Sequence, residues 1–190
     1  MRPLPIVSHR TPRLTLRLLQ PGDEGEFAAT FEESAEAWAP WTPAARPEAT
    51  AQDLFRRELD RGHRGAAGGT HLRLAAFDRA DRMVGLFALN EIVVGVFQSA
   101  YASWQVRVAD MGNGFGTEGA RALLEIAFSE SPDGLGLHRV QANIMPSNEI
   151  SLRIAEKLGL RREGLAERYL RIAGSWQDHV MFAITREEWS

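Results

Sequence analysis

Apolar and polar residues alternate along several short stretches of the chain. Residues 13–18 place three leucines on one side and arginine or threonine on the other, a pattern typical of a β-strand with one solvent-facing side. The hydrophobic pattern and its flanking turn residues predict further strands over residues 70–77, 83–92, 100–108, 138–145, 161–172 and 176–184. The polar segment 78–82 and the Ala173-Gly174 pair predict the turns of two hairpins.

Segments whose apolar residues have helical spacing lie between these strands. Pro21-Gly22-Asp23 predicts the start of a helix that carries Phe27 and Phe31, and Thr50 is a candidate N-cap for a helix over residues 48–64 that glycines 65–69 end. Further helices are expected over residues 117–128 and from Ser147 or Asn148 to residue 158. Antiparallel strands followed by a strand-helix-strand unit indicate a mixed α/β fold, and the length predicts a single domain over residues 1–190.

A glycine-rich loop joins the predicted strand 100–108 to the following helix. Gly112, Gly114 and Gly116 alternate with other residues, and Thr117 follows directly. Such a loop exposes successive backbone N–H groups, and the helix behind it adds the positive end of its dipole. The pattern therefore predicts a phosphate or pyrophosphate site.

The same loop also satisfies the dinucleotide pattern GxGxxG, from Gly114 to Gly119. A dinucleotide site needs an acidic residue about 20 positions later, at the end of the next strand, to bind the ribose. The strand 138–145 ends instead in Asn143, Ile144 and Met145, and Asp133 precedes it. Antiparallel strands upstream are also unlike a doubly wound sheet, so the dinucleotide interpretation is disfavoured.

Composition narrows the chemistry. The net charge of -3 argues against a general nucleic-acid binder, and the absence of cysteine excludes a thiol nucleophile. The sequence has neither a signal-peptide pattern nor a stretch long and apolar enough to span a membrane, so a soluble cytoplasmic protein without membrane contacts is expected. The histidines show no metal-ligand spacing, so we expect them to be structural or surface residues, with no bound metal.

Ordered segments from residue 11 to residue 189 resemble the GNAT acetyltransferases, and among them the RimJ/RimL branch, which acetylates protein N-termini and related amines. The loop Met111 to Gly116 keeps both glycines of that family's phosphate motif but has methionine in place of the initial glutamine or arginine. The other segments that carry the resemblance are 11–14, 38–41, 138–143 (HRVQAN), 148–151 (NEIS), 156–160 (EKLGL), 163–164, 174–179 (GSWQDH) and 188–189.

The resemblance implies a GNAT fold: antiparallel N-terminal strands, two central strands that splay apart, and helices on both faces of the sheet. It implies acetyl-CoA as the donor. Backbone groups near Val106, Arg107 and Val108 would bind the pantetheine arm and polarise the thioester. The pyrophosphate would lie on Gly112, Asn113, Gly114, Phe115, Gly116 and Thr117, and the cofactor would be lined by Asn143 and Asn148.

The resemblance also suggests catalytic residues, each with a plainer alternative. Ser151 is predicted as the general acid that protonates the leaving sulfur, although a serine in the first turn of a helix commonly bonds only local backbone. Glu91 is the candidate general base, acting through water, and is otherwise a solvated edge residue. Trp38, Trp41 and Tyr169 are expected to line the acceptor site, although the two tryptophans equally suit core positions.

The sequence does not decide which molecule accepts the acetyl group. A protein N-terminus is the leading expectation, a small amine such as an antibiotic or polyamine is the second, and a non-catalytic acyl-CoA-binding module is the third. The regions 33–64 and 92–100 are expected to build the acceptor pocket. The protein would act as a monomer or homodimer.

Overall fold

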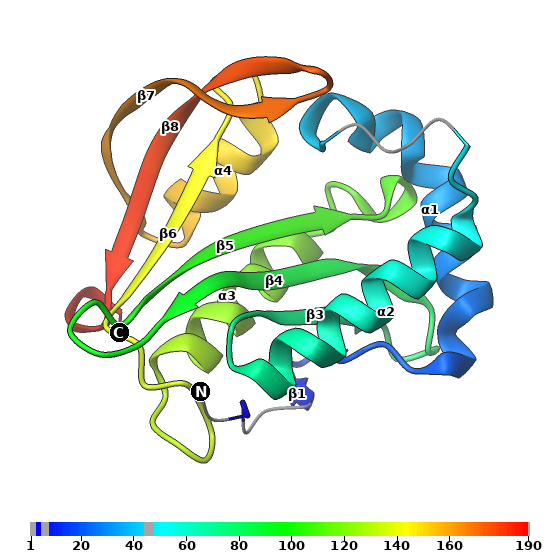
Figure 1. Ribbon diagram of the computed structural model, residues 1–190, viewed down its shortest axis with the longest axis horizontal. Helices are drawn as coiled ribbons and strands as arrows, with labels where there is room; N and C mark the ends of the chain where they lie inside the picture. The colour runs from blue at the N-terminus through cyan, green and yellow to red at the C-terminus, as the bar shows by residue number, and fades with distance from the viewer. Residues whose placement is uncertain (1–2, 5–7, 44–47, 190) are drawn as a thin grey trace.

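The computed structural model describes residues 3–4, 8–43 and 48–189, and within them eight strands form one sheet in the order β1-β2-β3-β4-β5-β6-β8-β7 (Figure 1). Neighbouring strands are antiparallel except β5 and β6. The strands are β1 (Ser8–Arg10), β2 (Thr15–Arg17), β3 (Leu72–Phe77), β4 (Met83–Val93), β5 (Ser99–Val106), β6 (Arg139–Ile144), β7 (Arg161–Ile172) and β8 (Ser175–Thr185).

Helices cover both faces of this sheet. Helices α1 (Glu24–Trp38) and α2 (Ala51–Gly68) pack on one face, and α3 (Phe115–Phe128) and α4 (Glu149–Lys157) lie on the other (Figure 1). Short 3-10 helices add η1 (Pro21–Asp23), η2 (Ala39–Trp41), η3 (Val108–Asp110) and η4 (Arg186–Glu188). The mixed α/β architecture expected from the sequence is confirmed.

Helices α2 and α4 begin at predicted capping residues, whereas α3 begins at Phe115, two residues before its predicted start. The Thr50 side chain accepts the Asp53 N–H at the start of α2, and Asn148 does the same for Ser151 at the start of α4. The predicted end of α2 near residue 64 is wrong, because the helix continues to Gly68 and ends at Gly69, whose φ is 69°. Gly65 does not end the helix. Its lack of a side chain allows a close approach to His71, since a β-carbon at Gly65 would be 2.7 Å from His71 Cβ.

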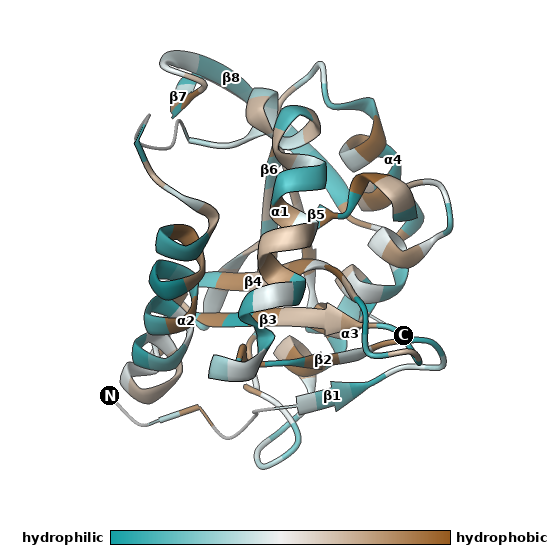
Figure 2. Cartoon of the chain, turned by 90° about the vertical axis from the view of Figure 1, so that its right-hand side faces the viewer, coloured by the Kyte–Doolittle hydropathy of each residue, from teal (hydrophilic) through white to brown (hydrophobic). Residues whose placement is uncertain are grey.

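Alternate residues of the strands supply two apolar clusters. Leu72 and Leu74 of β3 belong to the larger cluster, which includes the buried side of α3 and α4. Ala75 and Phe77 point the other way and pack with Phe27 and Phe55 of α1 and α2. In Figure 2 the helix α2 is mostly hydrophilic with hydrophobic positions between, whereas hydrophobic residues are frequent along β3 and β4. None of the described helices is long and apolar enough to cross a membrane.

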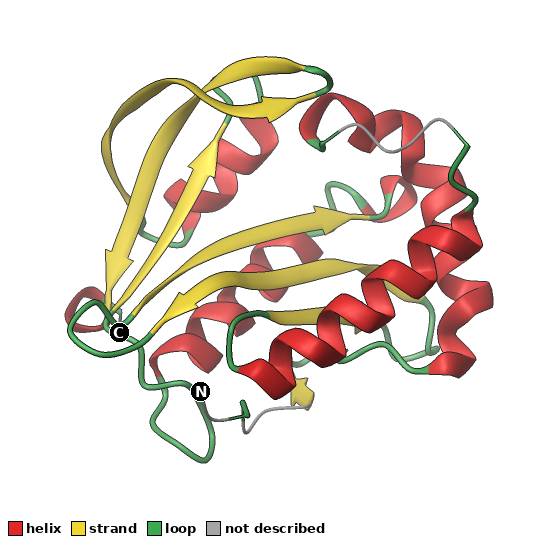
Figure 3. Cartoon of the chain, viewed as in Figure 1, coloured by secondary structure: helices red, strands yellow, loops and turns green. Residues whose placement is uncertain are grey.

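The two central strands separate soon after they pair. β5 and β6 are joined only where Ser99, Ala100 and Tyr101 face residues 139–141. Past that point β5 stays paired with β4 as far as Val106, and β6 stays paired with β8 as far as Ile144. The strands therefore diverge, as Figure 3 shows, and the predicted splay is confirmed.

Candidate active site

A cavity of about 190 Å³ lies where β5 and β6 diverge. Residues 102–106 of β5 form one wall, and residues 142–145 form the opposite wall. The first turn of α4 contributes Ile150 and Ser151, while Trp38 and Trp41 close another side. The lost strand pairing therefore creates a site that is reached from both faces of the sheet.

Strand pleating gives this cavity two chemically different faces. Trp104 and Val106 pack against the larger core cluster on the α3 and α4 side. Because side chains alternate along a strand, Tyr101 and Ser103 point to the opposite face. Tyr101 is in register with Gln141 of β6, so Asn143, two residues further, shares this second face. We call the α3 and α4 side the donor face and the opposite side the acceptor face.

Ser151 lies on the donor face with its hydroxyl oriented by a tryptophan. The Trp104 Nε1–H donates to Ser151 Oγ at 3.2 Å, and the Ser151 N–H donates to Asn148 Oδ1 at 3.1 Å. An indole nitrogen can only donate, so Ser151 Oγ accepts this bond and keeps its own proton to donate elsewhere. The local helix contact is therefore present, and the hydroxyl hydrogen stays available for the predicted role as general acid. Trp104 was not predicted, since its partner is 47 residues away.

The glycine loop borders a second cavity of about 270 Å³. Gly112 and Gly114 have φ of 80° and 82°, a conformation that favours glycine. Gly114 is the N-cap of α3 and offers no side-chain cap, unlike Thr50 and Asn148 at α2 and α4. The first amides of α3 are thus left for an anion.

The opposite side of this second cavity is basic, and the cavity joins the first. Arg153 and Lys157, one helical turn apart on α4, face the loop across it. The two cavities share the lining residues Val106, Met111, Ile150 and Ile154. The combined space suits a long ligand with phosphates at one end and a reacting group at the other. The residues of the predicted phosphate loop that line this cavity are Gly112, Gly114, Gly116 and Thr117. The loop also contains the predicted residues Asn113 and Phe115.

Part of the predicted pantetheine contact needs correction. The Arg107 N–H already donates to Val84 O at 2.7 Å, and the Val108 N–H donates to Ser34 Oγ at 3.1 Å. These two amides are therefore satisfied within the protein. Neighbouring strand residues direct their backbone groups to opposite edges, so the N–H and C=O groups of Val106 face the gap between β5 and β6. Trp38 Nε1 donates to the Val106 carbonyl oxygen at 2.9 Å. Only Val106 of the three stays a candidate for a backbone contact.

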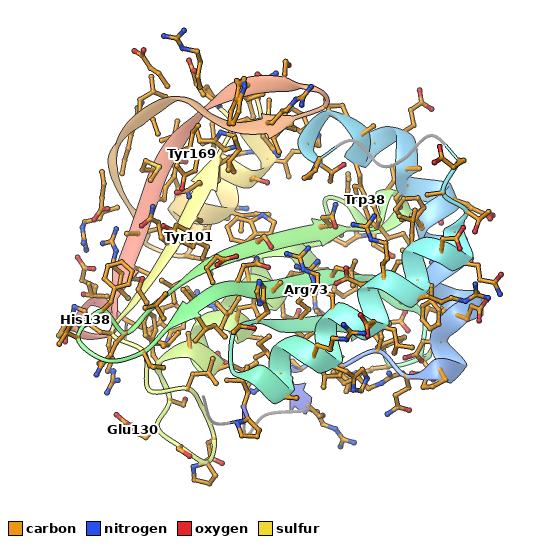
Figure 4. The ribbon with its side chains drawn as sticks, viewed as in Figure 1. Trp38, Arg73, Tyr101, Glu130, His138 and Tyr169 are labelled. Carbon is orange, nitrogen blue, oxygen red and sulfur yellow. The ribbon has the colours of Figure 1, made fainter. Side chains whose placement is uncertain are left out.

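The acceptor face carries a chain of side-chain hydrogen bonds. Gln141 Nε2 donates to Asn143 Oδ1 at 3.0 Å, and Asn143 Nδ2 donates to the Tyr169 hydroxyl at 3.1 Å. Asn143 was predicted on the cofactor, but the structure joins it to Tyr169. Burial, and then neighbouring Tyr101, raise the pKa of Tyr169 above its ordinary value. Figure 4 shows both tyrosines near β6 and Trp38 near the end of β5.

The tryptophans and the β7–β8 hairpin enclose the acceptor face. Trp38 is 6% exposed and Trp41 is 37% exposed, and both line the first cavity. Trp38 is therefore both a buried residue and part of the cavity wall. The Ala173 N–H at the hairpin tip donates to Thr42 O at 3.1 Å, which ties the hairpin to the segment after η2. Residues 44–47 of the region expected to build the acceptor pocket lie outside the described residues.

Glu91 is not brought to the cavity. It lies in the irregular part of β4 between Asn90 and Val93, has φ of 48°, and places its carboxylate 3.5 Å from His71 Nε2. Its side chain is 67% exposed. The geometry gives no support to its predicted role as general base. A β-bulge redirects the side chain, and local alternation in the sequence does not reveal a bulge.

An N-terminal arginine braces the glycine loop from outside the cavity. Arg13 Nη1 donates to Asn113 O at 2.9 Å, and Arg13 Nε donates to Glu118 Oε2 at 2.6 Å. Its guanidinium lies 4.5 Å from the Phe115 ring centroid. Thr11 also donates to Glu118. Burial raises the pKa of Glu118, but the hydrogen bonds from Thr11 and Arg13 outweigh it and lower that pKa overall. We call Thr11, Arg13 and Glu118 the loop brace.

Splayed central strands and an uncapped helix start behind a glycine loop fit an acyl-CoA-dependent acyltransferase. The chain belongs to the family with an acetyltransferase (GNAT) domain, whose family model matches residues 13–161. It is therefore an acetyl-CoA-dependent N-acetyltransferase. Within the described residues, no group of three or more histidines and carboxylates could hold a metal ion.

Individual relatives agree with this family. A [Ribosomal protein uS5]-alanine N-acetyltransferase of Escherichia coli (strain K12) is 27% identical over 98% of this chain and 95% of its own length. The probable N-acetyltransferase YjcK of Bacillus subtilis (strain 168) is 38% identical over 55% of each chain. The solved structure of Mycobacterium smegmatis RimJ in complex with CoA-disulfide superimposes with a TM-score of 0.89 at 24% identity, over 99% of this chain and 91% of that one, and shares the fold.

The loop brace generates a first prediction. Arg13→Gln removes the charge-assisted bond to Glu118 and the bond to Asn113 O, so the loop is less well ordered before the cofactor binds. Because Arg13 is partly exposed, we expect a modest effect, an acetyl-CoA KM raised by about tenfold, or ~1.4 kcal/mol, with kcat changed less than about twofold. Steady-state kinetics with varied acetyl-CoA measures both constants.

Arg64→Gln is the matched control, since Arg64 pairs with Asp60 on the exposed side of α2, away from the loop, and its acetyl-CoA KM should equal that of wild type. The lowered pKa of Glu118 adds a pH dependence: the brace contributes stability fully above the ordinary value of 4.5 and loses it as pH falls through the lowered pKa. An unchanged KM in Arg13→Gln would show that the loop keeps its shape without the brace.

Proposed function

We propose that this enzyme acetylates the N-terminal α-amine of a protein by direct attack of the amine on acetyl-CoA in a ternary complex. The observation that carries the proposal is the cavity between β5 and β6, which places Ser151 on the donor face and Asn143 and Tyr169 beside the acceptor face. The absence of cysteine removes a thiol acyl-enzyme route. The length of the match to the Escherichia coli relative supports a protein acceptor.

Acetyl-CoA fits the residues present. The positive-φ glycines and the uncapped start of α3 suit the pyrophosphate. A β-carbon at Gly116 would be 2.9 Å from Ile154 Cδ1 and 3.3 Å from Val106 Cγ2, so glycine at this position lets the start of α3 pack closely against two residues that line both cavities. Acetyl-CoA supplies the activated acetyl group, and Arg153 and Lys157 offer positive charge to its phosphates.

The protein's own groups then orient the reaction. The Ser151 hydroxyl, held by Trp104, donates its proton to the departing sulfur. Val106 N–H faces the gap and contributes a backbone donor near the carbonyl. Trp38 and Trp41 exclude water from the acceptor side. A chain end enters such an enclosed site more readily than a side chain in the middle of a folded protein.

Peptide assays test the acceptor class. Peptides that begin with Ala, Ser or Met should release coenzyme A thiol from acetyl-CoA, and the same peptides with a blocked N-terminus but an internal lysine should not. The reason is that only the free chain end presents an α-amine to the enclosed site. Thiol release with a polyamine and with none of the peptides would replace the protein acceptor by a small amine.

Substitution of Ser151 tests the proposed acid. Ser151→Ala should lower kcat by about a hundredfold, since general acid catalysis commonly contributes that much, while the coenzyme A dissociation constant changes less than about threefold. Ser175→Ala is a control, because that hydroxyl lies at the hairpin turn and accepts a hydrogen bond from Gln177 there. Equal losses of turnover, cofactor affinity and thermal stability would instead identify Ser151 as a structural residue of α4.

A further inference from the structure

His179 of β8 lies in the wall of the cavity between β5 and β6 and has no role in the scheme above. It is 4% exposed. Among the described residues that line this cavity, it is the only one with an imidazole, carboxylate, amine, phenol or guanidinium group. The amine must lose protons as it is acetylated, and Glu91 lies elsewhere, so His179 is the ionisable group at hand.

Its hydrogen bond defines which nitrogen is basic. His179 Nδ1 lies 3.0 Å from Gln177 O. A carbonyl oxygen only accepts, so Nδ1 carries the hydrogen in the neutral ring and Nε2 carries the lone pair. In the described part of the chain no hydrogen bond reaches Nε2. No described side-chain nitrogen or oxygen without a hydrogen-bond partner is fully buried, so Nε2 retains some accessible surface. Because His179 lines the cavity, we infer that Nε2 is accessible from it.

Strand register places this nitrogen on the acceptor face. Val180 is paired with Ile144 of β6, and both side chains belong to the core on the donor side. His179 precedes Val180, so its side chain points to the opposite face, the one that Asn143 and Tyr169 occupy. The His179 and Tyr169 rings pack edge to face with centroids 5.6 Å apart. This packing holds the imidazole opposite the side from which Ser151 acts.

We propose that His179 Nε2 is the general base that takes a proton from the acceptor amine. An ammonium acceptor first loses one proton, through Nε2, to solvent. As the nitrogen–carbon bond forms and the carbon–sulfur bond breaks, the second amine proton passes to Nε2, and the sulfur gains a proton from the Ser151 hydroxyl. Serine regains its proton from solvent as His179 releases one, so the net products are the amide, the free thiol and one proton.

The environment of His179 contains few charges. From β7, Tyr169 contacts the ring, and the charged residues next to it are Glu167 and Arg168; on β8 the neighbour is Asp178, whose carboxylate accepts the Arg168 N–H at 2.7 Å. Tyr101 approaches from β5, behind Tyr169. β6 presents the neutral amides of Gln141 and Asn143. The η2 side presents Trp38, Trp41 and Thr42, which are also neutral.

Histidine suits an α-amine acceptor in particular. An α-amine has an ordinary pKa of about 7.7–8.0, compared with about 10.4 for a lysine side chain. An imidazole nitrogen therefore takes a proton from an α-amine with a smaller penalty than from a lysine amine. The inference rests on the acetyl transfer proposed above, but the base is needed whichever amine accepts.

His179→Asn tests the proposal, because the asparagine amide can replace the Nδ1–H bond to Gln177 O but offers no basic nitrogen. Wild type and variant are assayed with the peptide or small amine that wild type acetylates fastest. We expect kcat/KM for the acceptor to fall by about a hundredfold near about pH 7, with coenzyme A affinity and melting temperature close to wild type. The deficit should shrink near about pH 9, where an α-amine is already neutral.

His63→Gln is the matched control, since His63 Nε2 also contacts a backbone carbonyl, Leu19 O at 2.8 Å, but lies on α2 outside the cavity. It should keep the wild-type pH profile. A His179→Asn enzyme with wild-type kcat/KM overturns the proposal, and so does a loss that is equal at every pH. Wild-type activity on a polyamine alone would overturn the protein acceptor, while the comparison of the two pH profiles would still decide the role of His179.

Discussion

The loss of pairing between β5 and β6 after Tyr101 and Gln141 is the constraint on which the rest of the site depends. Parallel strands that diverge leave backbone groups without ladder partners, and buried polar groups of that kind are costly. The protein satisfies one of them at Val106, whose carbonyl accepts the Trp38 indole hydrogen. The same opening forms the cavity, which is lined by residues from both faces of the sheet.

The opening also brings segments that are distant in the sequence to opposite faces of the cavity. α4 and the glycine loop lie on the donor face, where Ser151 and the uncapped first amides of α3 suit the thioester and the phosphates. The β7–β8 hairpin lies beside the acceptor face and contributes Tyr169 and His179. In the proposed mechanism, Ser151 and His179 act from opposite faces of one sheet, which keeps the proton donor for sulfur apart from the proton acceptor for nitrogen.

Local patterns predicted much of this fold, because strand alternation and capping residues act over a few positions. The glycine loop and the N-caps at Thr50 and Asn148 could be identified from neighbouring residues alone. The bonds that orient the site were not predicted, since Trp104 meets Ser151 and Trp38 meets Val106 across 47 and 68 residues. Long-range contacts of this kind leave no local signal. The sequence likewise gives no sign that His179 lies in the wall of the cavity, because strand register over a long range brings it there.

The account depends most directly on the claim that backbone amides of the glycine loop hold the cofactor. Calorimetric titration of coenzyme A into wild type, Gly114→Val and Gly95→Val measures this. Gly114 and Gly95 have φ of 82° and 78°, so both valines carry a similar backbone strain, but only Gly114 lies in the loop. The account predicts that coenzyme A binding is lost in Gly114→Val and retained in Gly95→Val. Wild-type affinity in a folded Gly114→Val protein would contradict it.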